Sequence, residues 1–320
     1  MVNEIEGKIL RAFQDSGDYV SGETLSRVLG ISRVSIWKHI RSPKEDGYIV
    51  EASHKGYRLI SSPDLLLPCE FPGWERKIHH FRELSSTMDV ARELARKGAD
   101  AGTIVIAECQ TQGKGRLSRE WLSPEGGIYF SVILRPQISP IYAPRINLMA
   151  SIAVATTIRK LFGLKAELKW PNDVLIEGKK VCGILAEMDA EVDAINFVNL
   201  GIGINVNSSV PQFEKTATSL KDELGKEISR KEFLSSVLTE MDGQQALLTK
   251  ADLLEEWKSI SATLNKQVRI VAPGETIEGQ AVDIDTNGAL IVRSKDGTLR
   301  TVVAGDCIHL KQDTSRIPQR

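Results

Sequence analysis

The pattern of the sequence changes twice along the chain, and these changes constrain the fold more than any other feature. Helical periodicity alternates with short polar breaks as far as residue 60. It then stops at a cluster of breaking residues: Ser61, Ser62, Pro63, Pro68, Pro72 and Gly73. Helical and strand-like runs are mixed from about 75 to 263, and after Asn265 only short strand-like runs remain. We therefore predict an α+β protein of three regions with a tail: 1–62, 75–263, 264–312 and 313–320.

Composition bounds the class of protein. A chain of 320 residues, 42% of them apolar, is long enough for about two domains with ordinary cores. Its formal net charge of -1 excludes a surface that is basic throughout, so any contact with DNA requires a local basic patch. Acidic residues precede any apolar run at the N-terminus, and no apolar run approaches the ~20 residues of a membrane span. We therefore expect a globular cytoplasmic protein with no membrane partner.

The spacing of the cysteines also favours a cytoplasmic protein. Cys69, Cys109, Cys182 and Cys307 are far apart and form no Cys-x-x-Cys pair, and no paired histidine spacing accompanies them. Widely spaced cysteines without a metal or redox motif are most simply reduced thiols in a protein core. We therefore expect four free, buried thiols.

The first region predicts three short helices followed by a hairpin. Four residues at helical spacing form an apolar face near the N-terminus: Ile5, Ile9, Leu10 and Phe13. Ser21 begins a second helix that Gly30 ends, and Ser32 caps a third. The apolar surface of the third helix is expected from Val34, Ile36, Trp37 and Ile40. Strand-like runs over 48–51 and 57–60, on either side of a turn at 53–56, complete a winged helix-turn-helix.

The third helix carries the local basic patch that the overall charge requires. Between Ile31 and Lys44 the chain has cations and no acidic residue. The residues predicted to contact DNA are Ser21, Arg33, Ser35, Lys38 and Arg41. Pro43 lacks a backbone N–H donor, so this helix should end near Arg41 or Ser42. A helical bundle that docks another protein is the alternative, which the wing and the polar third helix disfavour.

The second and third regions differ in their strands. Strands are predicted over 103–108, 128–134 and 195–200, and helices over 145–161, 230–248 and 252–260. This indicates a mixed β-sheet backed by helices. Later strands over 268–271, 279–284, 289–292 and 299–303 are separated by Pro273-Gly274, Asn287-Gly288 and Asp296-Gly297. Asn-Gly and Asp-Gly tolerate the positive φ that a two-residue hairpin loop requires, so we predict a small C-terminal β-barrel.

Two segments carry the chemistry. Gly113–Trp121 places Lys114, Arg116 and Arg119 on a glycine-rich loop that ends in an indole. Glycine lets a backbone approach a ligand closely, and the cations can neutralise carboxylate and phosphate oxygens. The second segment runs Lys169-Trp170-Pro171-Asn172-Asp173 and is followed over 178–185 by Gly-Lys-Lys-Val-Cys-Gly-Ile-Leu. For the loop alone, a solvated surface turn is the alternative.

Together these segments resemble the biotin-protein ligases, in which the first is the biotinyl-adenylate loop and the second lines the catalytic site. The resemblance runs from about residue 3 to residue 312. It implies a class II synthetase-like ligase domain between the winged helix-turn-helix and an SH3-like C-terminal barrel. The implied activity uses ATP to activate biotin as biotinyl-5'-AMP. It then transfers biotin to a lysine of a biotin carboxyl carrier protein, in acetyl-CoA carboxylase and related carboxylases.

The winged helix-turn-helix implies a second function. Bifunctional members of the family repress genes of biotin synthesis and transport, with biotinyl-5'-AMP as corepressor. The resemblance therefore implies operator DNA as a partner and a homodimer when biotinyl-5'-AMP is bound. We expect the loop over 113–121 to be mobile until the adenylate orders it, because its like charges and small apolar surface stabilise no single conformation. This ordering is expected to couple ligand binding to dimerisation and to DNA binding.

The resemblance also assigns roles to single residues. The catalytic residues are Lys180, Asp173 and Arg116, and the two cations would offset the repulsion between the carboxylate of biotin and the α-phosphate of ATP. The expected biotin contacts are Ser86, Thr87, Gln110, Lys114, Gly115, Arg116, Lys180, Gly201 and Ile204. The expected contacts to ATP or the adenylate are Arg116, Arg119, Trp121, Lys169, Asn172, Lys180 and Asn205. Mg²⁺ is implied by the use of ATP, and no set of protein metal ligands is visible.

Several of these residues also have a purely structural interpretation. Ser86 and Thr87 can cap a helix, since Asp89 and a helical run follow them. Trp121 can belong to a core, Gly201 can mark a crowded strand, and Lys180 can be a solvated lysine after a turn.

Asp173 can simply form a turn. As a functional residue it would position the acceptor lysine and take its proton, because a lysine with a pKa near ~10.4 is protonated at pH 7. Lys169 is expected to hold this carboxylate ionised.

Two other functions fit parts of the pattern. A lipoate-type acyl-protein ligase shares the chemistry, and a non-catalytic repressor could sense biotinyl-adenylate without turnover. The Gly-Lys-Gly-Arg loop and the Gly-Lys-Lys-Val-Cys-Gly segment argue against the first. The presence of Lys180, Arg116 and Asp173 argues against the second. A bifunctional ligase and repressor is therefore the prediction.

Overall fold

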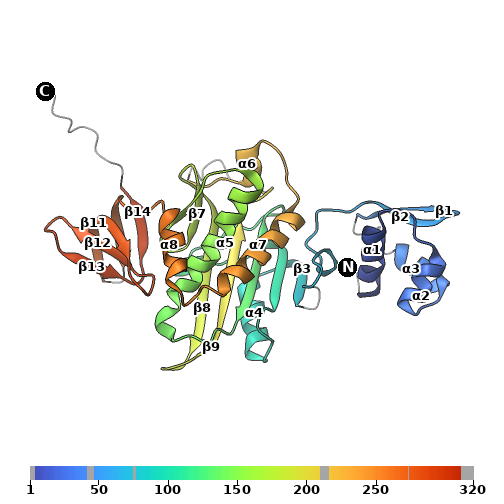
Figure 1. Cartoon of the computed structure of the whole chain (residues 1–320), viewed down its shortest axis with the longest axis horizontal. Coiled ribbons are helices and arrows are strands. Elements are labelled where there is room, and N and C mark those ends of the chain that lie inside the picture. Colours follow the sequence, from blue (N-terminus) through green and yellow to red (C-terminus); the bar gives the residue numbers. More distant parts are fainter. Residues whose placement is uncertain (1–3, 42–46, 75–76, 210–215, 273, 311–320) are drawn as a thin grey trace. The chain divides into compact units, whose positions relative to one another are not determined.

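The structure, a computed structural model, describes residues 4–41, 47–74, 77–209, 216–272 and 274–310. The chain divides into two compact units, Met1–His80 and Phe81–Arg320. Figure 1 shows the helical N-terminal unit in blue, followed by the central sheet and the C-terminal strands. The α+β fold class predicted from the sequence is confirmed.

The N-terminal unit is a winged helix-turn-helix, as predicted. It contains α1 (Glu4–Ser16), α2 (Gly22–Leu29) and α3 (Arg33–Arg41), then β1 (Ile49–Ser53) and β2 (Gly56–Ser61). The two strands pair in antiparallel fashion and form the wing. The helices bury a common core that includes Ile9, Phe13, Leu25, Ile36 and Ile40. This core fixes the orientation of α3 within the unit.

The capping residues that the sequence suggests are present. Ser21 accepts a hydrogen bond from the Thr24 N–H at 3.0 Å, and Ser32 accepts one from the Ser35 N–H at 3.1 Å. Gly30 ends α2 with φ 68, a left-handed conformation that glycine adopts at little cost. The described part of α3 ends at Arg41. Pro43 lies outside the described residues.

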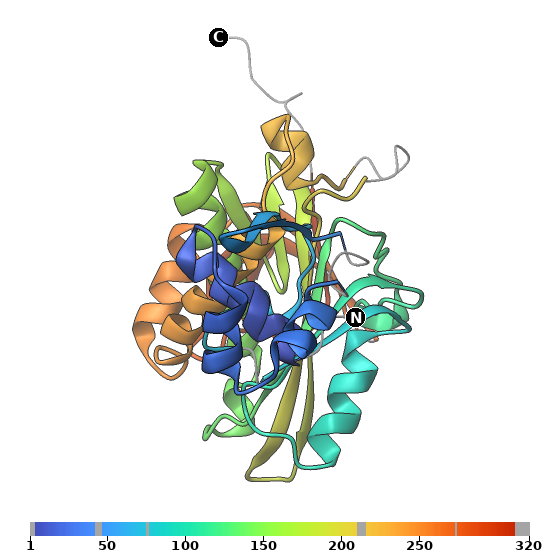
Figure 2. The same ribbon diagram turned by 90° about the vertical axis from the view of Figure 1, so that its right-hand side faces the viewer.

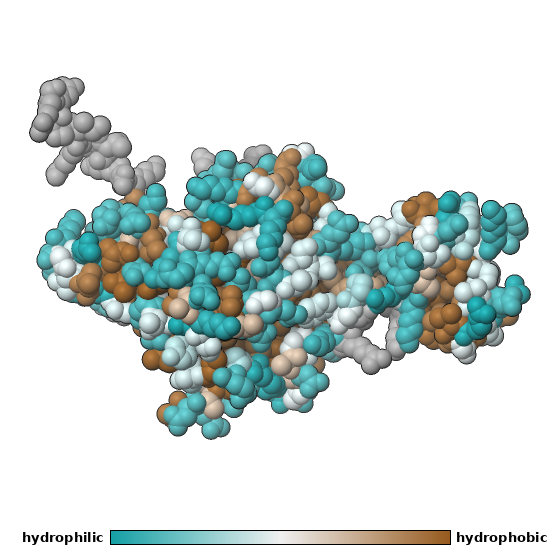
Figure 3. Space-filling view, viewed as in Figure 1, coloured by the Kyte–Doolittle hydropathy of each residue, from teal (hydrophilic) through white to brown (hydrophobic). Residues whose placement is uncertain are grey.

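The prediction for the apolar face of α3 was half wrong. Ile36 and Ile40 are buried, but Val34 is 66% exposed and Trp37 is 49% exposed. Ile36 and Ile40 are four residues apart and share one face, whereas Val34 and Trp37 fall on the face that carries Lys38 and Arg41. The exposed face of α3 is therefore both cationic and apolar. Figure 3 shows hydrophobic side chains at the surface of this unit among hydrophilic ones.

The segment after the wing is packed rather than loose. Leu66, Leu67 and Phe71 are buried although prolines interrupt the periodicity around them. A short 3-10 helix, η2 (Pro68–Glu70), lies against α1. The hydroxyl of Tyr48 donates to the Glu70 carboxylate at 2.7 Å, and burial raises the pKa of this phenol well above its usual value.

The second unit is built on a seven-stranded sheet. Its strands lie in the order β3 (Ile78–Leu84), β4 (Ile104–Gln110), β5 (Ile128–Leu134), β9 (Ile195–Ile204), β8 (Lys179–Ala190), β7 (Asp173–Ile176) and β6 (Ala166–Lys169). The pairs from β4 to β6 are antiparallel. The three strands predicted for this region are confirmed, and β9 extends to Ile204, beyond the predicted end at 200. No strand was predicted for β3, β6, β7 or β8.

Helices cover both faces of this sheet. They are α4 (Thr87–Arg96), α5 (Pro144–Phe162), α6 (Leu220–Leu224), α7 (Arg230–Gln245) and α8 (Ala251–Ser259), with short 3-10 helices η3 (Arg116–Ser118) and η4 (Pro140–Tyr142). Figure 2 shows α4, in teal, and α7 with α8, in orange, on opposite sides of the sheet. The three predicted long helices are confirmed, although α7 ends earlier than predicted, at Gln245.

One helical stretch, Pro140–Phe162, is long and apolar enough for a membrane span by length and composition alone. Sixty-seven per cent of its apolar window is buried inside the protein, as in the core helix of an ordinary globular domain. A helix that is apolar on most sides has the pattern of a buried helix as well as of a span, so this stretch does not overturn the expectation that the chain has no clear membrane span.

The C-terminal strands form a five-stranded antiparallel sheet. The strands are β10 (Gln267–Ala272), β11 (Glu275–Ile284), β12 (Leu290–Ser294), β13 (Leu299–Val302) and β14 (Asp306–His309), in the order β13-β12-β11-β10-β14. A β-rich C-terminal domain was predicted correctly. The sequence missed β14 and the first residues of β11, because β14 has four residues and β11 begins with polar ones.

The four cysteines all lie within the described residues and form no disulfide. Cys182 and Cys307 are buried as expected, but Cys69 and Cys109 are partly exposed. Burial raises the pKa of the Cys307 thiol to about 12.

Candidate active site

Three glycines form the floor of a pocket on the sheet. Gly183 of β8 pairs with Gly203 of β9, and Leu185 pairs with Gly201 two residues along. These residues lie on one face because strand side chains alternate. A Cβ atom at Gly201 would overlap the Met88 sulfur, and one at Gly203 would overlap the Trp121 indole. The glycines therefore provide the space in which other side chains and a ligand can lie against the sheet.

Most of the predicted site residues line this pocket, which encloses about 750 Å³ of space partly open to solvent. They are Ser86, Thr87, Gln110, Lys114, Gly115, Arg116, Arg119, Trp121, Asn172, Asp173, Lys180 and Gly201. Three predicted residues do not line it. Ile204 is fully buried, Asn205 donates to the Thr218 carbonyl at 3.0 Å, and Lys169 contacts Asp173 from outside the lining.

The pocket also contains residues that were not assigned individual contacts from the sequence. Met88 and Glu120 had no predicted role, whereas Gly183, Ile184 and Leu185 belong to the segment expected to line the site, and Ile202 and Gly203 belong to the strand end expected at the biotin pocket. The signal for the glycines was present in the sequence, since Gly183, Gly201 and Gly203 are strand glycines. Their common face depends on the register between β8 and β9, which the sequence does not reveal.

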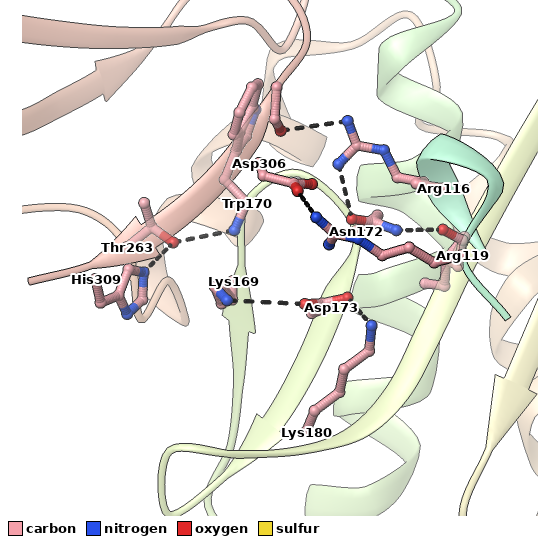
Figure 4. Close-up of polar contacts among 12 residues, drawn as sticks. Arg116, Arg119, Lys169, Trp170, Asn172, Asp173, Lys180, Thr263, Asp306 and His309 are labelled. Carbon is pink, nitrogen blue, oxygen red and sulfur yellow. Dashed lines mark hydrogen bonds and ion pairs between the residues drawn. The ribbon is translucent and has the colours of Figure 1, made fainter. Parts of the chain in front are cut away.

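The cations of both segments face carboxylates of the protein. Lys114 Nζ lies 2.5 Å from Asp89 Oδ1, and Lys180 Nζ lies 2.6 Å from Asp173 Oδ1. Arg119 pairs with Asp306. Figure 4 shows the pairs Lys180–Asp173 and Arg119–Asp306. The expectation that like charges leave the loop without stabilising contacts was therefore incomplete, because acidic partners distant in the sequence neutralise them.

Arg116 joins the two segments. Its Nη1 donates to Asn172 Oδ1 and its Nη2 donates to the Gly305 carbonyl, each at 3.2 Å. Asn172 is itself held, because its side-chain amide donates to the Ile184 carbonyl at 2.5 Å. Burial lowers the pKa of the Arg116 guanidinium from its ordinary value. This guanidinium can therefore present further N–H donors to an anion in the pocket.

The partner of Asp173 differs from the one expected. Lys169 Nζ is 4.0 Å from Asp173 Oδ2, whereas Lys180 Nζ is at hydrogen-bond distance from the other oxygen (Figure 4). The reason is the hairpin of β7 and β8, which places Lys180 beside β7. Lys180 is the closer of the two cations that stabilise the carboxylate.

Two buried polar atoms in the pocket have no hydrogen-bond partner in the described part of the chain. They are Ser86 Oγ and Trp121 Nε1. Ser86 occupies the N-cap position of α4, but its side chain makes no capping bond. Thr87 Oγ1 accepts from Ser131, and its N–H donates to Gln110 Oε1 at 2.8 Å. Lys180 Nζ also lies 5.1 Å from the centre of the Trp121 ring.

A second groove lies within the winged-helix unit. Its lining includes Ser21, Gly22, Glu23, Arg33, Val34, Trp37, His54, Lys55, Gly56 and Tyr57. Of the predicted DNA contacts, Ser21 and Arg33 line the groove, and Lys38 and Arg41 are exposed on α3. Ser35 is half-buried. The Arg41 guanidinium lies 4.9 Å from the centre of the Trp37 ring. The groove combines cations with apolar surface.

The described residues contain no group of three or more histidine, cysteine, aspartate or glutamate side chains placed to hold a metal ion. Three carboxylates at or beside the pocket, those of Asp89, Asp173 and Asp306, each face a cation. The protein side chains present here therefore do not fit a metal cage formed by the protein alone.

The sequence matches three known families. Residues 81–207 match the Biotin/lipoate A/B protein ligase family, residues 263–310 match the Biotin protein ligase C terminal domain, and residues 6–58 match an HTH domain. The bifunctional ligase/repressor BirA of Bacillus subtilis (strain 168) is 38% identical over 317 residues, which cover 93% of this chain and 96% of that protein. The protein of the same name from Escherichia coli (strain K12) is 29% identical, over 93% of this chain and 95% of that one.

A solved structure has a similar fold over about three quarters of the chain. The biotin protein ligase from Aquifex aeolicus in complex with biotin and ATP superimposes with a TM-score of 0.64 at 29% identity. The match covers 73% of this chain and 98% of that one.

The glycine floor generates a first prediction. Gly203→Ala should push the Trp121 indole out of its position, because the added Cβ overlaps Nε1. We expect affinity for biotin, measured by calorimetry, to fall at least about tenfold, which corresponds to ~1.4 kcal/mol. Gly243→Ala in α7 is the matched control, since no atom lies within 4 Å of its added Cβ. Unchanged biotin affinity in Gly203→Ala would show that the indole position does not shape the pocket.

Proposed function

The chain belongs to the biotin protein ligase family, and from this membership we propose that it is a bifunctional enzyme and repressor. As an enzyme it is an ATP-dependent ligase that attaches biotin to a carrier protein. As a repressor it binds DNA through its winged helix-turn-helix. The observation that carries the ligase function is the convergence of Lys114, Arg116 and Lys180, from two segments, on one glycine-floored pocket.

The first half-reaction joins two anions. A carboxylate oxygen of biotin attacks the α-phosphorus of ATP, the bond to the β-phosphate oxygen breaks, and diphosphate leaves. At ~4 Å two unit charges repel by about 1 kcal/mol in water and by more in a site of lower dielectric constant. We propose that Arg116 and Lys180 lower this repulsion and stabilise the charge that develops on the phosphoryl oxygens. Lys114 and Arg119 would add charge from the loop.

The two unpartnered polar atoms fit the polar groups of biotinyl-5'-AMP, Ser86 Oγ the head group of biotin and Trp121 Nε1 the adenylate. A ureido ring offers both N–H donors and a carbonyl acceptor. Ser86 Oγ is completely buried and Trp121 Nε1 is a buried donor, so a polar ligand would satisfy atoms that are costly to leave unpaired. We propose that Ser86, Thr87 and Gln110 bind the ureido ring and that Trp121 packs against the adenylate. For Ile204 and Asn205 the contacts favour structural roles, and Lys169 would act through Asp173.

The second half-reaction transfers biotin to lysine. The lysine arrives as an ammonium, gives up one proton to become a nucleophilic amine, and attacks the acyl carbon; an amide forms, AMP leaves, and the amide nitrogen releases a second proton to solvent. We propose that Asp173 positions the incoming ammonium and accepts the first proton, which requires it to part from Lys180. The phosphate of the adenylate is the anion that Lys180 would contact instead. Lys180 would then move from Asp173 to the adenylate phosphate, which stabilises the intermediate and frees Asp173 for the transfer step.

Mg²⁺ is proposed to accompany ATP. Magnesium commonly binds through substrate phosphates and few protein carboxylates, which agrees with the absence of a three-residue acidic cluster among the described residues. It would neutralise charge on the departing diphosphate.

The partners and boundaries are proposed as follows. The acceptors are carrier domains of acetyl-CoA carboxylase and related carboxylases, and the repressor acts on operator DNA as a homodimer formed with biotinyl-5'-AMP. The location is the cytoplasm, where ATP, carrier proteins and DNA are available together. The boundaries 1–62, 75–263 and 264–312, with a tail over 313–320, are supported by the family matches at 6–58, 81–207 and 263–310.

A single assay tests the ligase function. The protein is incubated with labelled biotin, ATP, Mg²⁺ and a biotin-acceptor domain, with lipoate as a competing acid. Label should appear on the acceptor only when ATP is present, and lipoate should not compete. Preference for lipoate would indicate a lipoate-type ligase, and adenylate binding without transfer would indicate a non-catalytic sensor.

Arg116→Ala is predicted to release biotinyl-5'-AMP. Removing a charge-assisted contact to phosphate costs roughly 1.5 to 3 kcal/mol, so retention of the adenylate should fall about tenfold to more than a hundredfold. Filter retention of labelled adenylate over time measures this release. Arg96→Ala, which removes an exposed arginine of α4, is the control and should retain the intermediate. Equal retention of the adenylate in both variants would show that Arg116 does not hold the phosphate of the intermediate.

Asp173→Asn is predicted to separate the two half-reactions. The amide keeps the shape of the carboxylate but cannot accept a proton, so adenylate should form while transfer to the acceptor slows by roughly 10² to 10⁴. Single-turnover assays with and without the acceptor domain measure each step. Equal losses in both steps would mean that Asp173 organises the site rather than activating the acceptor lysine.

DNA binding is predicted to depend on the ligase reaction. Operator affinity should rise with biotin plus ATP and fall when the acceptor consumes the intermediate. Lys38→Ala or Arg41→Ala should weaken binding to DNA of every sequence. The slope of the logarithm of the DNA-binding constant against the logarithm of salt concentration should become less steep by about 1, as expected for one lost phosphate contact. Arg96→Ala removes the same charge from the ligase region and should have no such effect. Gel shifts and sedimentation on the same samples test this, and tight operator binding by a monomer indifferent to biotin and ATP would contradict it.

A further inference from the structure

Strand β14 contacts both segments of the active site. At its N-terminal end the Gly305 carbonyl accepts from Arg116 and the Asp306 carboxylate pairs with Arg119, both from the loop. At its C-terminal end His309 lies beside Thr263, which holds Trp170 of the second segment. Figure 4 shows both ends of the strand beside the catalytic side chains.

The second contact is a short chain of hydrogen bonds. The Trp170 backbone N–H donates to Thr263 Oγ1 at 3.0 Å, and Thr263 Oγ1 lies 3.0 Å from His309 Nε2. The Trp170 indole also donates to the Gly288 carbonyl at 3.1 Å. Trp170 is 1% exposed and Thr263 is 0% exposed, so neither hydroxyl nor N–H can exchange its partner for bulk water.

His309 is neutral in this chain of hydrogen bonds. Burial, with Lys169 and Lys266 nearby, lowers the pKa of His309 to about 4, and only Asp173 opposes this shift. The imidazole is therefore neutral at physiological pH. The Thr263 hydroxyl accepts from Trp170 and keeps one proton and a second lone pair, so it can pair with His309 Nε2 in either tautomer of the ring.

We propose that Thr263 and His309 are positioning residues that hold the Trp170–Asp173 turn in its reactive place. The inference rests on the proposed ligase function and extends it to residues outside the two motifs. Asn172 and Asp173 follow Trp170 after one residue, Pro171, and they bind Arg116 and Lys180. The Thr263–His309 pair therefore acts through the turn on both cations that approach the adenylate. A displacement of about 1 Å at such a turn can slow a reaction on the order of a hundredfold.

The role differs from proton transfer. The side chains of Thr263 and His309 do not line the pocket, and Lys169, Lys266 and Asp173 are the charged groups around His309. Because the folded pKa of His309 is about 4, its neutral fraction does not change above about pH 5. A positioning role therefore predicts that replacing His309 lowers kcat by the same factor at every pH from about 6 to 9.

The test uses Thr263→Val, which removes the hydroxyl and keeps the shape, and Thr263→Ser, which keeps the hydroxyl. In the full-length protein we expect Thr263→Val to lower kcat for ligation at least tenfold. The KM for biotin should change less than about twofold, because Ser86, Gln110 and Trp121 lie on other segments. Thr263→Ser should restore most of kcat. His309→Gln, which offers an acceptor near Nε2, should lose less than His309→Leu.

These measurements distinguish failure of the positioning role from loss of the fold and from failure of the ligase function. Full activity in Thr263→Val, or equal losses in Thr263→Val and Thr263→Ser, would overturn the proposal. A KM for biotin that rises in proportion to the loss of kcat would also overturn it, because the pair would then act on binding. Thermal unfolding of each variant identifies loss of the fold, and His309→Gln then decides the question. Failure of the proposed function itself looks different, since wild-type protein would then not ligate biotin at all.

Discussion

The pairing of Lys180 with Asp173 at 2.6 Å is the interaction on which the site depends. It couples β7 to β8 and holds both groups at the edge of the glycine floor, beside Asn172 and Arg116. Two other cations are paired in the same way, Lys114 with Asp89 and Arg119 with Asp306. A substrate anion therefore meets cations that already have partners, and recognition becomes an exchange of one anion for another. Such an exchange favours the ligand whose carboxylate and phosphate match several cations at once.

This scheme explains why parts of the chain far apart in sequence meet at one place. The loop supplies Arg116, the second motif supplies Asn172, and the C-terminal sheet supplies the Gly305 carbonyl, all within hydrogen-bond distance of one guanidinium. Gly305 and Asp306, at the start of the last C-terminal strand, thus hold two arginines that line the site. The glycines at 183, 201 and 203 complete the arrangement by leaving the sheet face open.

The sequence predicted those features that depend on local order. Helix caps such as Ser21 and Ser32, the wing, the long helices and the two motifs all depend on neighbouring residues, and each is found in the structure. It did not predict pairings across long distances, such as Arg119 with Asp306 or Lys180 in preference to Lys169 as the partner of Asp173. It also missed β14, because a strand of four residues is too short to show a periodic pattern. It placed Val34 and Trp37 in the core, whereas both are exposed on the face of α3 that carries the cations.

The central claim is that converging cations recognise the acyl-phosphate of the adenylate. The most direct measurement is the affinity of the protein for two analogues of biotinyl-5'-AMP, one with an anionic phosphodiester linker and one with a neutral linker of the same length. The account predicts that the anionic analogue binds at least about tenfold more tightly, a difference of ~1.4 kcal/mol, and that the gap narrows as salt is added. Equal affinities for the two analogues at low salt would contradict it.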